Sequence, residues 1–147
     1  MNKSLFSLAL ISTFAAGMLG AAEHKIAKKD VPAAVVSGVA RDYPNTPVKT
    51  WEQDMRDGAP IYEVGIPKAG AIETLVYSAD GKLIETEDDF PVKNLPEPVV
   101  AAIHKKYPQA TIRSADKVTR GSEIRYEVGL RGANKKEVVV SAAGEIL

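Results

Sequence analysis

The chain has 147 residues, of which 45% are hydrophobic and 26% charged, an ordinary composition for a globular protein. Its 19 basic residues balance its 19 acidic residues, so it lacks the basic excess that usually marks a nucleic-acid-binding protein. The sequence contains no cysteine, which excludes disulfides, cysteine-based zinc sites, thiol catalysis and a lipidated N-terminal cysteine.

The first 22 residues are organised like a secretory signal peptide. Lys3 supplies a positive charge, residues 5–19 are uncharged and mostly apolar, and the small residues Gly20, Ala21 and Ala22 follow. The apolar stretch is shorter than the roughly 20 residues of a membrane-spanning helix, so an uncleaved anchor is the less favoured alternative. We expect cleavage after Ala21 or Ala22, a periplasmic or secreted mature chain, and no stable membrane insertion.

The rest of the sequence repeats itself with an offset of 64 residues. The best-matching block is Tyr62-Glu63-Val64-Gly65, which corresponds to Tyr126-Glu127-Val128-Gly129. The register holds across a predicted helix, a turn and three predicted strands, which a chance match would not do. We therefore predict two repeats, at residues 23–90 and 91–147, after the signal peptide at 1–22.

Each repeat is predicted to begin with a helix, because apolar residues recur every four positions. These residues are Val31, Val35, Val39 and Tyr43 in the first repeat, and Leu95, Val99, Ile103 and Tyr107 in the second. Pro44 and Pro108 end the two helices. Asp30 and Asn94 are expected as the N-caps, with Pro32 and Pro96 in the first turn, and Asn94 with Glu97 resembles a capping box.

Strand candidates follow each helix, separated by turn residues such as Asp57-Gly58, Asp80-Gly81 and Gly121-Ser122. They span residues 48–55, 61–66, 72–78 and 82–86 in the first repeat, and 111–119, 124–130 and 136–141 in the second. The predicted fold class is α+β, with each helix packed on a three- to four-stranded antiparallel sheet. The acidic run Glu85–Asp89 is interpreted as a solvated linker, with a calcium site as the less favoured alternative because no EF-hand spacing is present.

One helix covers one face of a sheet, so the other face is expected to be open. Taking Val48 and Ile112 as inward-facing, strict alternation places the lone tryptophan, Trp51, on the open face beside basic residues. The protein-binding candidates on that face are Trp51, Lys49, Met55, Arg113, Lys117 and Arg125. A bulge that shifts the register by one residue would instead place Trp51 in the core, and this alternative stays open.

No catalytic arrangement is recognisable in the sequence. His24 lies at the expected mature N-terminus and His104 lies beside Lys105 and Lys106, off the apolar stripe. Nucleophile, metalloprotease, P-loop and dinucleotide-binding motifs are missing. We therefore expect neither an enzyme nor a cofactor. The two repeats differ in charge: residues 23–90 carry eight basic and 13 acidic residues, and residues 91–147 carry ten basic and six acidic residues.

The order of helix, Tyr-Pro, strand, glycine turn, Tyr-Glu-Val and final glycine turn resembles the PepSY-like domain, a family also described as β-lactamase-inhibitor-like. The resemblance covers both repeats. It rests on residues 95–108, on Tyr62-Glu63-Val64 and Tyr126-Glu127-Val128, and on Ala79-Asp80-Gly81-Lys82-Leu83. It implies a tandem repeat whose open sheet face holds a partner protein. The inhibitors in the family carry disulfides and this chain has none, so the resemblance implies the fold and not the target.

These observations favour an exported, non-enzymatic binding module, an inhibitor or modulator of an envelope protein or peptidase. The alternative is a self-associating assembly protein of the periplasm, a homo-oligomer held by its oppositely charged repeats. A third hypothesis is small-ligand or metal binding, including a copper or nickel site at Ala22-Glu23-His24 if cleavage follows Ala21.

Overall fold

The computed structural model describes residues 24–147, so the predicted signal peptide and Ala22-Glu23 lie outside the described residues. Two α-helices, α1 (Ala33–Asp42) and α2 (Glu97–Lys106), accompany eight strands that pair in chain order into one antiparallel sheet. The strands are β1 (His24–Lys25), β2 (Thr50–Arg56), β3 (Ala59–Lys68), β4 (Ala71–Ser78), β5 (Leu83–Asp89), β6 (Thr111–Arg120), β7 (Glu123–Arg131) and β8 (Glu137–Ser141). The predicted α+β class, with two helix-plus-sheet units, is confirmed.

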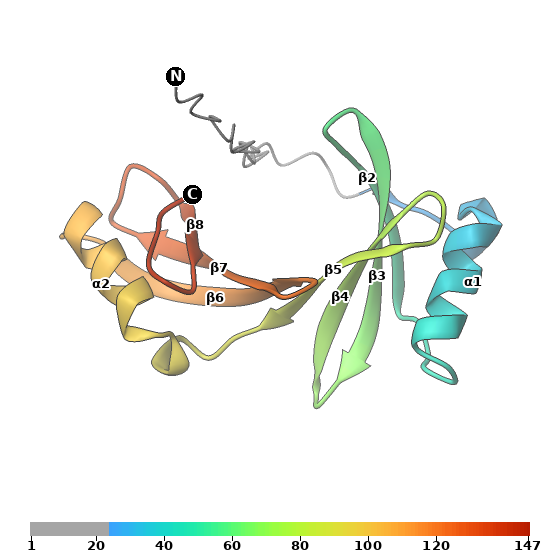
Figure 1. Cartoon of the computed structure of the whole chain (residues 1–147), viewed down its shortest axis with the longest axis horizontal. Coiled ribbons are helices and arrows are strands. Elements are labelled where there is room, and N and C mark those ends of the chain that lie inside the picture. The colour runs from blue at the N-terminus through green and yellow to red at the C-terminus, as the bar shows by residue number, and fades with distance from the viewer. Residues whose placement is uncertain (1–23) are drawn as a thin grey trace, which may run out of the picture.

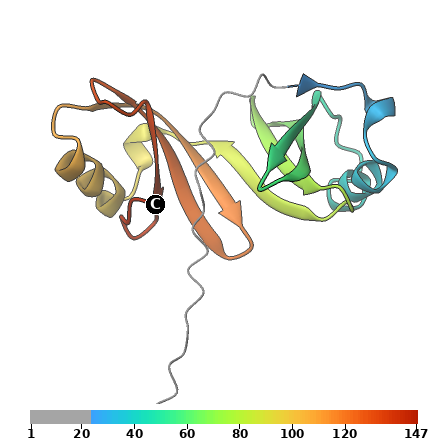
Figure 2. The ribbon, with the colours of Figure 1, turned by 90° about the horizontal axis from the view of Figure 1, so that it is seen from above.

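The two helices lie at opposite ends of the molecule with the sheet between them (Figures 1 and 2). Both pack on the same face of the sheet, which we call the helix face. The opposite face, which we call the open face, has no helix on it within residues 24–147. Because the helices are on the outside, the open faces of the two halves turn toward the middle of the molecule.

The apolar stripe of α1 forms the first core, as predicted. Val35 and Val39 are buried against Val64, Leu75 and Tyr77 of the sheet. The hydroxyl of Tyr77 donates to the carboxylate of Asp42 at the end of α1, at 3.1 Å, which satisfies the polar atom of an otherwise buried ring. Burial of such side chains stabilises the fold by about 1.5–3 kcal/mol each.

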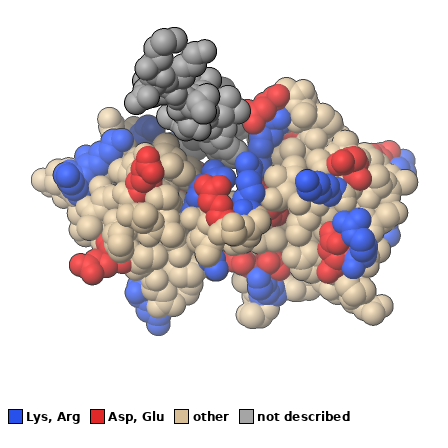
Figure 3. All heavy atoms as spheres, in the orientation of Figure 1, with Lys and Arg blue, Asp and Glu red and all other residues tan. Residues whose placement is uncertain are grey.

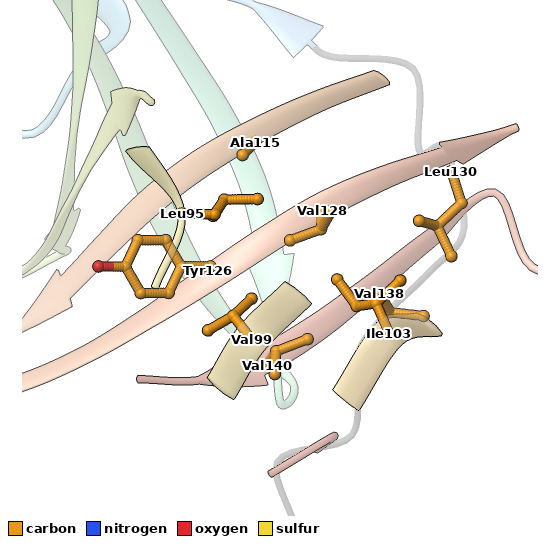
Figure 4. Packing of buried hydrophobic residues seen from close by; sticks show 9 residues of the cluster. All are labelled: Leu95, Val99, Ile103, Ala115, Tyr126, Val128, Leu130, Val138 and Val140. Atoms are coloured by element: carbon orange, nitrogen blue, oxygen red, sulfur yellow. The ribbon is translucent and has the colours of Figure 1, made fainter. Parts of the chain in front are cut away.

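The second core repeats this arrangement around α2 (Figure 4). Val99 and Ile103 of α2 are fully buried and face Val128, Val138 and Val140 of β7 and β8. The ring of Phe90 meets that of Tyr126 edge-on, with centroids 5.2 Å apart. Phe90 thus packs on the second core although it precedes the predicted boundary between the repeats, which itself stays a prediction.

The acidic run Glu85–Asp89 is a strand and not a solvated linker, so that prediction is wrong. β5 pairs with β4 on one side and with β6 on the other, from Thr86 opposite Thr119 to Asp89 opposite Asp116. The run alternates its side chains between the two faces like any strand. This pairing joins the two repeats into one continuous sheet.

The N-caps of both helices lie two residues later in the chain than predicted. Pro32 and Pro96 occupy the N-cap positions, and neither makes a side-chain capping bond. Asp30 and Asn94 instead end short 3-10 helices, Lys28–Asp30 and Val92–Asn94. The carbonyl of Pro96 accepts the N–H groups of Val99 and Val100 at 3.0 and 3.2 Å. The predicted caps and the capping box of Asn94 with Glu97 are therefore wrong.

Neither helix within residues 24–147 has the length and hydrophobicity that crossing a membrane would require.

Candidate binding face

A β-bulge at the same position of both repeats decides which side chains reach each face. In the second repeat the register shifts between Ile112 and Ser114, which leaves Arg113 unpaired opposite Gly129. In the first repeat the N–H of Lys49 donates to Gly65 at 2.8 Å while Thr50 pairs with the same glycine. Two residues thus lie opposite one, so the alternation of every later residue in the strand is inverted.

The bulge places Trp51 on the helix face, where it packs against the first core. It pairs with Val64, whose side chain is fully buried under α1. Its counterpart in the second repeat, Ala115, pairs with Val128 and is also buried. The expectation that Trp51 lies on the open face is wrong, and the alternative of a bulge that turns it into the core is confirmed.

The other predicted residues do not form one surface. Lys117 pairs with Tyr126 and so lies on the helix face, contrary to the prediction. Arg125 is on the open face, but only 5% of it is exposed, with Nε 3.2 Å from the Glu123 carboxylate. Met55 is 58% exposed but shares the inverted register of Trp51. Lys49 and Arg113 are exposed at the two bulges.

The open face is built from rows of residues that run across the strands. One row passes from Gly65 through Thr74, Glu87 and Val118 to Arg125. It crosses from the first repeat to the second without interruption. The rows on either side hold most of the other charged residues of this face. Two arginines bound to a glutamate lie toward one end of the face, and a group of carboxyl groups lies toward the other.

At one end of the open face, two arginines hold a single buried carboxylate. Arg120 donates to Glu85 through Nε and Nη2, at 3.1 and 2.9 Å, and Arg56 donates to its other oxygen. Arg56 and Arg120 occupy equivalent positions of the two repeats, and Glu85 comes from β5 between them. In Figure 3, acidic and basic side chains lie side by side in the middle of the molecule, between its two halves.

Toward the other end, carboxylates face one another across the strands. Asp89 lies directly opposite Asp116, which lies directly opposite Glu127, while Glu87 is two residues from Asp89 on the same strand. We call Glu87, Asp89, Asp116 and Glu127 the carboxylate patch. Like charges that face one another across strands destabilise a sheet, so the fold itself gains nothing from this arrangement.

Three carboxyl groups of the patch, Glu87, Asp116 and Glu127, have raised pKa values. Burial, reinforced by the charges of Glu127, Glu63 and Glu85, raises the pKa of Glu87 to about 8, although Arg56 opposes the shift. Burial and the neighbouring Asp89 raise the pKa of Asp116 to about 6. Burial and Glu137 raise the pKa of Glu127. Perturbed carboxyl groups gathered on one surface are typical of functional sites.

A hollow of about 310 Å³ opens beside the patch, where the β3–β4 hairpin meets the end of β5. Its lining residues are Lys68, Ala69, Ala71, Ile72, Asp88 and Asp89. Ile72 belongs to the open face and is 46% exposed, one of the few large apolar side chains that stay accessible. Lys68 is bound at 2.8 Å to both Glu73 and Asp88. The hollow therefore combines an apolar wall with two carboxylates and with the ammonium group of Lys68, which is held in ion pairs.

The raised pKa of Glu87 predicts that the protein is less stable at alkaline pH. The unfolded chain loses this proton near pH 4.5 and the folded chain only near pH 8, so unfolding releases a proton between these values. This contribution to stability is complete below about pH 4.5 and is lost as the pH rises toward 8. Because the group is partly solvated, we expect Glu87→Gln to increase the free energy of unfolding by about 1–2 kcal/mol at pH 9.

Urea denaturation of both chains at pH 5 and pH 9 measures this difference. We expect the effect of Glu87→Gln to shrink to a few tenths of a kcal/mol at pH 5. Glu145→Gln, which removes an exposed carboxylate outside the patch, serves as the control. An effect of Glu87→Gln that is the same at both pH values would contradict the raised pKa.

No group of three or more histidine, aspartate or glutamate residues within 24–147 is placed to hold a metal ion. The calcium alternative for Glu85–Asp89 gains no support, because this run alternates between the two faces of the sheet.

The chain matches one family of proteins over both halves. Residues 18–85 and residues 60–147 each match the family described as "Putative beta-lactamase-inhibitor-like, PepSY-like". No curated protein matches the chain.

Solved structures of Bacteroides proteins share the fold. A DUF2874 family protein from Bacteroides ovatus has a TM-score of 0.63 and 20% identity, with 79% of this chain and 84% of that one covered. A BLIP-like protein from Bacteroides fragilis has a TM-score of 0.59 and 21% identity, covering 78% and 81%. A structure from Bacteroides eggerthii, described as "putative periplasmic proteins", has a TM-score of 0.58 and 16% identity, covering 80% and 86%.

These structures are too distant in sequence to indicate more than the fold, whereas the two family matches together span the described chain. The chain belongs to the PepSY-like, beta-lactamase-inhibitor-like family.

Proposed function

We propose that this chain is an exported, non-enzymatic binding module that holds a protein of the bacterial envelope on its open face. The observation that carries the proposal is the carboxylate patch on a sheet face that no described segment covers. A protein folded for stability alone would not place Asp89, Asp116 and Glu127 opposite one another. Membership of a beta-lactamase-inhibitor-like family and likeness to proteins described as periplasmic also support it.

Site-specific photo-crosslinking in intact cells tests this proposal. A photo-reactive amino acid is placed on the open face, at Ile72 or Val139, and in matched control chains on exposed helix positions, Ser37 of α1 or Ala101 of α2. We expect adducts with another envelope protein from the open-face positions and not from the helix positions. Adducts that form equally from both sets, or from the helices alone, would overturn the assignment of the face.

Self-association is the second candidate, and the opposite charges of the two repeats favour it. Residues 23–90 have five more acidic than basic residues, and residues 91–147 have four more basic than acidic residues. In the same experiment it would give adducts of this chain with itself. If adducts of the chain with itself formed at the open-face positions, and none with another protein, self-assembly through the open face would replace the proposed function.

A further inference from the structure

The carboxylate patch and the neighbouring hollow suggest the chemistry of the partner, and this inference rests on the proposed function. We propose that the open face docks a polypeptide segment rich in arginine or lysine, with its cationic groups on the carboxylate patch and one long cationic side chain in the hollow beside Ile72.

Charge complementarity is the first argument. Four carboxylates of the patch come from β5, β6 and β7, and Glu63 and Glu137 extend it on either side. Of the arginines on the central strands of this face, Arg56 and Arg120 are bound to Glu85, and Arg125 is bound to Glu123. The ion pairs of these three arginines lie at the other end of the face, and Arg131 lies at the end of β7, beyond the patch. The patch itself holds only carboxyl groups and would attract a guanidinium or ammonium group.

The lining of the hollow is the second argument, and it adds an apolar wall to the charges of the patch. Arginine and lysine carry a charged group on an apolar stem, and they pack best where an apolar surface ends at a carboxylate. Ala71 and Ile72 provide the apolar wall, and Asp89 lies at its edge, where the hollow meets the patch. Lys68, which also lines the hollow, is bound to Glu73 and Asp88, so an incoming cation would meet the carboxyl pair of Asp89 and Asp116.

The protonation of the patch gives the proposal a distinctive pH dependence. The charged groups that influence Glu87 are Glu63 on β3, Glu85 on β5, Glu127 on β7 and Arg56 on β2, and its direct neighbours on β4 and β6, Thr74 and Val118, are uncharged. A cation bound at the patch favours the ionised form of Glu87, so binding releases a proton. Affinity should therefore rise from about pH 6 to about pH 9.

Titration calorimetry with defined peptides tests the proposal on the processed chain. The probe is a short peptide in which arginine alternates with alanine, and the control peptide has glutamate in place of arginine. We expect the arginine peptide to bind at low salt, with an affinity that increases with pH, and the glutamate peptide not to bind. The double variant Glu87→Gln, Glu127→Gln should bind about tenfold more weakly and lose most of the pH dependence.

Two further variants distinguish binding at the patch and the hollow from non-specific attraction between the peptide and the net charge of the protein. Asp30→Asn, Glu97→Gln removes the same number of carboxyl groups from exposed positions on the first 3-10 helix and on α2, and should leave the affinity within about twofold of the original. Ile72→Ser keeps the charge and alters the hollow, and should weaken binding by about threefold to tenfold. Equal weakening by the two double variants would overturn the proposal, since binding would then follow net charge alone.

Other results would overturn this inference and leave the proposed function standing. Crosslinks to an envelope protein at Ile72, together with no binding of the arginine peptide, would mean that the face takes a partner of different chemistry. A rise in melting temperature with calcium chloride but not with the peptide would identify a divalent cation as the occupant. If neither crosslinks nor peptide binding were found, the proposed function would fail as well.

Discussion

Replacing Gly81 by alanine should destabilise the protein by about 3 kcal/mol. Gly81 lies in the turn between β4 and β5 with a φ of +79°, which an alanine adopts at a cost of about 1 kcal/mol. A Cβ atom at this position would also lie 2.6 Å from the carbonyl carbon of Ala34 and would collide with its oxygen. Since the obstacle is backbone at the start of α1, the helix would have to move away from the sheet.

Gly58 is a matched control because its φ of +78° is nearly the same and a Cβ atom there would meet nothing within 4 Å. Gly58→Ala should therefore cost only about 1 kcal/mol, from the backbone conformation alone. The second repeat offers an independent test, because a Cβ at Gly144 would lie 2.5 Å from the carbonyl oxygen of Pro98. Urea denaturation measures all three, and equal losses at Gly81 and Gly58 would contradict the close approach of α1 to the turn.

The repeat, the two helical stripes and the hairpins could be predicted because each depends on local periods and turn residues. Val35, Val39, Val99 and Ile103 recur at helical spacing, and all four are buried under the sheet. The structure also confirms that the second strand of each repeat follows its predicted glycine turn, and that a strand follows Asp80-Gly81. Such features need no knowledge of what lies across the sheet.

The bulges could not be predicted from alternation because a bulge leaves no fixed pattern in its own strand. The sequence did contain one signal: Val48 and Trp51, like Ile112 and Ala115, are three residues apart and all contact a core. Three residues along a regular strand reverse the face, so a shared face requires an extra residue between them. The opposing glycines, Gly65 and Gly129, are a second such signal.

The open face was largely missed because its most informative residues are acidic and lie in a segment with low strand propensity. Aspartate and glutamate are depleted in strands, so Glu85–Asp89 looked like a linker. The segment becomes a strand because β4 and β6 supply partners on both sides, 33 residues apart at Thr86 and Thr119. Propensity was overridden by tertiary pairing. The sequence contained one signal for a strand here: Thr86, a residue common in strands, lies between Glu85 and Glu87.

Glu85 and the two arginines bound to it, Arg56 and Arg120, form what we call the Glu85 clamp. The clamp should be the second large contributor to stability, and Glu85→Gln should lower the free energy of unfolding by about 2–3 kcal/mol. Glu85 is 4% exposed and accepts hydrogen bonds from both Arg56 and Arg120. Glutamine keeps the size of the side chain but removes the negative charge, which leaves two guanidinium groups facing a neutral amide. The loss is smaller than for a fully buried pair because both arginines are partly exposed.

Glu123→Gln is the control, because Glu123 pairs with Arg125 while more than half of its own side chain is exposed. It should cost less than about 1 kcal/mol. The clamp joins β2 of one repeat to β6 of the other through β5, so Glu85→Gln should also reduce hydrogen-exchange protection in both strands together. Loss of protection in β2 alone would mean that Glu85 stabilises only its own repeat. Loss of protection in both β2 and β6 would mean that Glu85 holds the two repeats together as a single sheet.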